Sequence, residues 1–229
     1  TALDDCAMEA PAQALLALTG FAAMNGLVAL GAWRLVSILS GPLSSLDRTI
    51  AFFGIGAIGS LATMLLAGVF GAIGMPAALG IPAASTALIF AVTHNRATTP
   101  WVRDLAGAAS TLWRDHPRDL LVLLPGAALL ALVWTWAAPR PPFGFDPLNY
   151  HLVLANHFLS TGGLSVLEFP PYFEFFWYFP ANGELWSAWT WLPGGNGVFL
   201  PWVNLPFAIL LGLSVYGLFR QVGRSRAAS

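Results

Sequence analysis

The chain is poor in charge. Only 9% of its 229 residues are Asp, Glu, Lys or Arg, whereas about 25% are charged in an ordinary soluble domain. Hydrophobic residues make up 57%, and the mean hydropathy is +0.69. This composition excludes an ordinary soluble domain and predicts an integral membrane protein.

Lysine is absent and cysteine occurs once. With Cys6 alone, the chain can form no internal disulfide and no cysteine-rich metal site. All ten basic residues are arginine, and no cluster of them reaches the density of a nucleic-acid-binding surface. We therefore expect no nucleic-acid partner.

Long apolar runs are abundant. A bilayer core needs about 20 apolar residues for each helical crossing. Five windows meet this requirement to within a few residues, and they cover residues 13–33, 50–70, 77–92, 120–137 and 198–218. The third is the shortest and contains Pro82. About five transmembrane helices are therefore expected.

The arginines orient these helices. Two lie between the first two windows, four between the third and fourth, and three after the fifth. Because successive helices cross the membrane in opposite directions, these nine arginines share one side and only Arg140 lies on the other. By the positive-inside rule, the arginine-rich side is the cytoplasm. We expect a multi-pass protein of a bacterial-type inner (plasma) membrane, with its N-terminus outside and its C-terminus cytoplasmic.

Two parts are expected along the chain. Residues 1–119 form an N-terminal three-helix membrane module followed by a cytoplasmic amphipathic segment, in which Trp101 lies at the headgroup level. In this module Gly56 and Ser60 share a helical face, which favours close helix packing within the chain. Residues 120–229 contain a helix, a long outer loop (138–197) and a last helix. The fold class is therefore all-α, a polytopic membrane protein whose outer loop contains short interfacial helices.

Aromatic residues crowd the second half of the outer loop. The stretch EFPPYFEFFWYFPANGELWSAWTW, residues 168–191, is full of Phe, Tyr and Trp. Such a segment is expected along the outer membrane surface. It is typical either of an aromatic belt or of a groove for a lipid-borne or carbohydrate ligand, and both interpretations stay open.

The stretch GFDPLNYHLVLANHFLSTGGL, residues 144–164, concentrates ionisable groups. Asp146 before Pro147 is a strong helix-start signal, because the carboxylate accepts from free first-turn amides and proline loses no needed donor. A helix over 147–160, closed by Thr161 and two glycines, is predicted. A carboxylate fixed at the outer face can also act as a general base, with Tyr150 one turn on. Both roles of Asp146 stay open.

Three further polar residues are site candidates. His151 and His157 lie six residues apart and face different directions on a helix, which argues against joint metal binding. Either alone suits hydrogen bonding or phosphate contact. Glu184 fits the first turn of a short helix begun by Asn182 and Gly183, or a second carboxylate that converges on Asp146. No metal-ligating residue is assigned.

A series of motifs covers roughly residues 120–220. In order, it contains F-D-P-L-N-Y-H-L, F-L-S-T-G-G-L and Y-F-P-A-N-G-E-L-W-S-A-W, followed by an apolar helix that ends in arginine. It resembles the first periplasmic loop of GT-C membrane glycosyltransferases, the superfamily of protein mannosyltransferase and aminoarabinose transferase relatives. The resemblance implies sugar transfer from a polyprenyl-phosphate donor to a lipid, protein or glycan at the outer face. It implies that Asp146 occupies the position of the family's conserved loop acid. That acid serves as base or helps hold a metal, so binding of a divalent metal stays an open question.

The same resemblance makes Tyr150, His151, His157 and Glu184 substrate-binding candidates, and a lipid-linked sugar and membrane lipid the expected partners. The chain departs from the pattern at Pro147, where many relatives carry a second acid. The family's core continues for several more helices, so we expect the N-terminal part of such an enzyme. The alternative is a non-catalytic, GT-C-derived accessory subunit packed against other membrane protein subunits in a larger complex.

Overall fold

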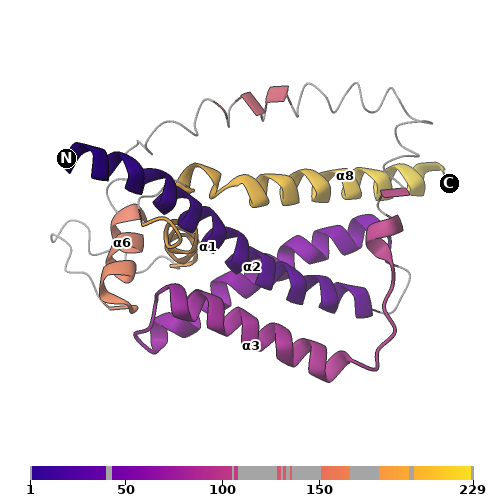
Figure 1. Cartoon of the computed structure of the whole chain (residues 1–229). Coiled ribbons are helices and arrows are strands. Elements are labelled where there is room, and N and C mark those ends of the chain that lie inside the picture. Colours follow the sequence, from indigo (N-terminus) through magenta and orange to yellow (C-terminus); the bar gives the residue numbers. More distant parts are fainter. Residues whose placement is uncertain are drawn as a thin grey trace.

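Long helices dominate the computed structural model of the chain (Figure 1). The structure describes residues 2–39, 43–104, 106–107, 128–129, 131–132, 135, 151–165, 181–195 and 199–227. Its elements are α1 (Ala2–Ile38), α2 (Ser45–Val69), α3 (Met75–Thr93), α6 (Leu152–Thr161), α7 (Asn182–Trp191), the 3-10 helix η3 (Leu200–Trp202) and α8 (Leu205–Ala227). No strand occurs in this part of the chain, which agrees with the all-α class.

Four of the helices are long and apolar enough to cross a membrane. They are Ala12–Ile38, Ser45–Val69, Met75–Thr93 and Leu200–Leu218. These spans correspond to four of the five expected from the sequence. The remaining expected span, residues 120–137, lies mostly outside the described residues. The protein is therefore a multi-pass membrane protein.

Small residues let α1, α2 and α3 pack closely together. A Cβ added to Gly31 would lie 2.8 Å from Thr86 Oγ1, and one added to Gly56 would lie 4.0 Å from Val28 Cγ1. Ser60 is buried, with 2% of its surface exposed. The face of α2 predicted to pack within the chain does so, against α1.

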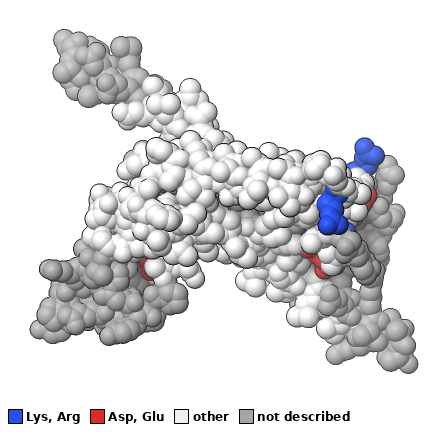
Figure 2. All heavy atoms as spheres, turned by 90° about the horizontal axis from the view of Figure 1, so that it is seen from below, with Lys and Arg blue, Asp and Glu red and all other residues white. Residues whose placement is uncertain are grey.

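Two buried arginines close one end of this three-helix group. Arg34 donates from Nε to Thr93 Oγ1 at 2.9 Å and from Nη2 to the Thr93 carbonyl, and Arg48 donates from Nη1 to the Val36 carbonyl at 2.9 Å. The last carbonyls of a helix have no partner within that helix. The guanidinium groups therefore add donors to the backbone amides from which these carbonyls accept at the C-termini of α3 and α1. Figure 2 shows that the described arginine side chains gather at one end of the molecule.

The helices alternate in direction. In Figure 1, α1 and α3 run one way and α2 runs in the opposite direction, while α8 ends near the start of α2. A Cβ added to Gly217 would lie 3.5 Å from Leu46 Cδ2, which confirms this contact. The start of α1 and the end of α8 lie at opposite sides of the molecule.

Trp101 is buried against the end of α1. It is only 4% exposed, and its Nε1 donates to Ser37 Oγ at 3.2 Å. The Phe52 ring lies 5.8 Å from it, centroid to centroid. The end of α1 offers this indole a hydrogen-bond acceptor, so it packs against α1 and α2. Most of the amphipathic segment after Trp101 lies outside the described residues.

Helix α7 packs inside the protein, at the opposite end from the arginines. Trp186 and Trp189 are 8% and 1% exposed. Trp186 Nε1 donates to the Val203 carbonyl at 2.6 Å, and Trp189 Nε1 donates to Asn25 Oδ1 at 3.2 Å. Because both indoles find acceptors in the protein, this part of the aromatic segment forms core, and neither the surface belt nor the ligand groove describes these two rings.

The end of α6 is anchored to the turn between α2 and α3. Gly162 has φ +72°, so the helix ends in the left-handed conformation predicted by its glycines. The Ile73 amide donates to the Gly162 carbonyl at 2.6 Å, and the Leu164 amide donates to the Gly68 carbonyl at 3.3 Å. These bonds fix the position of α6 beside α7.

Candidate functional site

The N-terminal ends of α6 and α7 bring two candidate residues together. His151 immediately precedes α6, and Glu184 lies in the first turn of α7, as its sequence context predicts. His151 Nδ1 lies 2.7 Å from Glu184 Oε1, although the residues are 33 positions apart. We call this arrangement the His151–Glu184 pair.

The pair joins a buried carboxylate to a more accessible ring. The side chain of Glu184 is 3% exposed, and that of His151 is 39% exposed. Burial of a carboxylate is unfavourable unless charge and hydrogen bonds compensate. The positive end of the α7 dipole and the His151 bond supply part of that compensation.

The second carboxylate oxygen of Glu184 has no such hydrogen bond among the described residues. Oε2 is buried and has no hydrogen-bond partner among the described residues. Buried polar atoms in folded proteins almost always have a partner, in the protein or in ordered water. Glu184 therefore retains a buried acceptor for an incoming proton donor.

The pair has a defined hydrogen-bond direction. The carboxylate oxygen accepts, so His151 Nδ1 is the donor in this hydrogen bond. A carboxylate that fixes the tautomer and orientation of a histidine is common where the other ring nitrogen contacts a substrate or metal. The arrangement suits His151 for hydrogen bonding to a ligand.

His157 has different neighbours. Its Nε2 lies 3.2 Å from the Ser165 carbonyl oxygen and 3.0 Å from Ser165 Oγ, at the far end of α6. Six residues of helix separate it from His151 by about 9 Å along the axis. The structure thus brings His151 and Glu184 together and leaves His157 apart from them. The two other candidates, Asp146 and Tyr150, lie outside the described residues.

A divalent metal does not fit the described residues alone. His151 Nε2 and Glu184 Oε2 are two ligand atoms, and the described part of the chain holds no group of three or more His, Cys, Asp or Glu side chains suited to a metal. Protein sites for divalent ions usually supply three or more ligands. We therefore derive no chemical step through a metal.

Asn25 contributes to the site indirectly and was not singled out from the sequence. Its Nδ2 donates to the Phe21 carbonyl at 2.8 Å, and its Oδ1 accepts from Trp189. The bond to Trp189 docks α7, and with it Glu184, against α1. The sequence does contain a signal for this contact. Asn25 carries an amide side chain inside an apolar run, where a polar side chain requires a partner.

No protein-family model, curated protein or solved structure matches the chain. The likeness to GT-C enzymes therefore rests on the sequence motifs.

Proposed function

We propose that the chain is a GT-C-type membrane glycosyltransferase, or the N-terminal part of one, which transfers a sugar from a polyprenyl-phosphate donor at the outer membrane face. The observation that carries the proposal is the buried Glu184 carboxylate, held by His151 and left with an unpartnered oxygen. A buried, incompletely paired carboxylate in a membrane protein is a frequent mark of a functional site.

The position of the pair supports this assignment. Helix α6 is bonded to the turn between α2 and α3, whereas Arg34 and Arg48 lie at the other end of these helices. If arginines mark the cytoplasmic side, the pair lies at the outer end. This is the orientation proposed for a bacterial-type inner membrane, with the N-terminus outside and the C-terminus inside.

In the proposed reaction, Asp146 removes the proton from the acceptor hydroxyl. The resulting oxygen attacks the anomeric carbon of the donor sugar, a new glycosidic bond forms, and the bond to polyprenyl phosphate breaks. His151 binds the donor through Nε2, Glu184 orients the ring, and Tyr150 is proposed as a further substrate-binding residue. Asp146 thereby positions the acceptor, and His151 positions the donor, for in-line transfer.

Sugar transfer in vesicles tests the proposal. We expect Asp146→Asn to lower the rate about 100-fold or more, because loss of a general base has effects of this size. His157→Gln is the control and should stay within about twofold, because His157 contacts the end of α6 and not the pair. Unchanged transfer by the Asp146 variant would exclude the assigned role.

A non-catalytic membrane subunit is the second candidate. Helix α8 is the least buried of the four spans, and Leu211 and Leu218 on it are 65% and 61% exposed. Such a helix has surface for partner helices as well as lipid. In this case the His151–Glu184 pair only ties α6 to α7. Recovery from native membranes in fixed ratio with other subunits, without transferase activity, would favour this candidate.

A further inference from the structure

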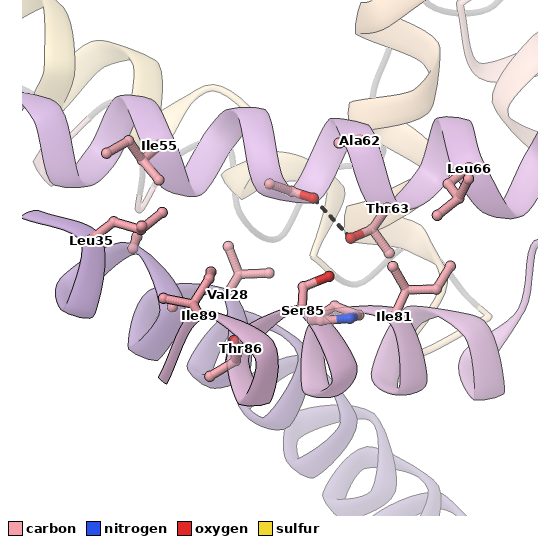
Figure 3. A pocket seen from close by; sticks show the side chains of 14 residues that line it. Val28, Leu35, Ile55, Ala62, Thr63, Leu66, Ile81, Ser85, Thr86 and Ile89 are labelled. Atoms are coloured by element: carbon pink, nitrogen blue, oxygen red, sulfur yellow. Dashed lines mark hydrogen bonds between the residues drawn. The ribbon is translucent and has the colours of Figure 1, made fainter. Parts of the chain in front are cut away.

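A cavity of about 210 Å³ lies between α2 on one side and α1 and α3 on the other (Figure 3). In Figure 3, Ile55 and Leu66 face it from α2, Val28 faces it from α1, and Ile81 and Ile89 face it from α3. None of the 14 described residues that line it is charged.

Three hydroxyl groups lie in the lining, and two of them are used within the protein. Thr63 Oγ1 donates to the Gly59 carbonyl at 2.8 Å, and Thr86 Oγ1 donates to the Leu27 carbonyl at 2.9 Å. The third, that of Ser85, belongs to an exposed residue at the edge of the cavity. Water needs two to four polar partners to occupy a cavity, so this one is suited to an apolar occupant.

The cavity lies within the membrane-spanning segments. Its lining covers positions 55–66 of the span Ser45–Val69 and positions 81–89 of the span Met75–Thr93. Ala62 and Ser85 in the lining are exposed, so the cavity opens at the surface of the three-helix group. The medium at that depth is lipid hydrocarbon, and an empty apolar space would forfeit dispersion contacts.

The volume of the cavity suits a lipid chain. An engineered apolar cavity of about 150 Å³ is known to bind benzene. At about 210 Å³, this cavity therefore has room for a thin hydrocarbon segment.

We propose that this cavity holds one acyl chain of a membrane phospholipid, bound between α2 and the α1–α3 pair. The bound chain fills the space between the three helices and supplies contacts that they do not make with one another. The site is separate from the His151–Glu184 pair and does not depend on the proposed transferase activity.

Photolabelling in defined vesicles tests this site. The full chain is reconstituted in phosphatidylcholine vesicles that contain a phosphatidylcholine with a diazirine in the middle of one acyl chain. After irradiation, peptide mapping should find adducts on Ile81, Ser85 and Ile89, which line the cavity, in excess of those on Leu88 and Ile58, which are exposed outside it.

Ala62→Trp introduces an indole into the cavity from an exposed position and should lower the adducts on the α3 lining about fivefold or more, because the indole competes with the acyl chain for this space. Ala87→Trp is the matched control, exposed on α3 but outside the lining, and should leave labelling unchanged. If Ala62→Trp fails to fold, Ser85→Phe tests the same cavity from α3. Equal labelling of the filled and unfilled proteins would overturn the proposal.

Discussion

Gly68 sets the contact between α2 and the segment that follows α6. A Cβ added there would lie 2.6 Å from Leu164 Cγ and 3.2 Å from Ile73 Cδ1. Leu164 has little freedom to retreat, because its amide donates to the Gly68 carbonyl. Overpacking of this kind costs about 1–3 kcal/mol. Gly68→Ala should therefore displace the end of α6 and destabilise the protein.

The helix propensity of alanine opposes this loss by about 0.5–1 kcal/mol. Gly54→Ala isolates that gain, since a Cβ at Gly54 would have no neighbour within 4 Å. The free energy of unfolding, followed by tryptophan fluorescence in micelles, should differ between the two variants by about 1–3 kcal/mol. In a Leu164→Ala background, Gly68→Ala should cost less than in the unsubstituted protein, because the clash is absent there. Two variants of equal stability would refute the close contact.

Two further variants test hydrogen bonds that hold the helices, by the same unfolding measurement. Trp189→Phe keeps a ring but loses the bond to Asn25 and some packing, so the free energy of unfolding should fall by about 1 kcal/mol or more. The loss should be about 1 kcal/mol smaller in an Asn25→Leu background, and an equal loss there would contradict the bond. Arg34→Met removes the donors to Thr93 and should lower the free energy of unfolding by about 1.5–3 kcal/mol. The exposed Arg96→Met is its control and should stay within about 0.5 kcal/mol. Equal effects of the two arginine variants would contradict the capping role of Arg34.

The spans could be predicted from the sequence because hydropathy is a local property. Their ends could not. The expected first span stops at position 33, before Arg34, whereas α1 continues to Ile38. Arg34 is buried within the helical part of the chain because its guanidinium group donates to Thr93, 59 residues further along the chain. A hydropathy window contains no information on that distant partner.

Some features of the candidate site could likewise be predicted from the sequence, and others could not. The end of α6 at Gly162 and the first-turn position of Glu184 follow from local backbone preferences, so the sequence predicts both. The burial of Glu184 and its bond to His151 depend on how α6 and α7 dock, through contacts such as Trp189 with Asn25. Those contacts join segments far apart in the chain, and no local pattern specifies them.

The central claim is that the His151–Glu184 pair belongs to a site of sugar transfer. Its most direct test measures release of polyprenyl phosphate by vesicles of the unsubstituted protein and of Glu184→Gln, with the mannose, glucose and aminoarabinose forms of the donor. We expect release from at least one donor, and a kcat about tenfold or more lower in the variant, because misorienting a histidine typically costs this much. Absence of release from every donor, or equal kcat values for the two proteins, would contradict the claim.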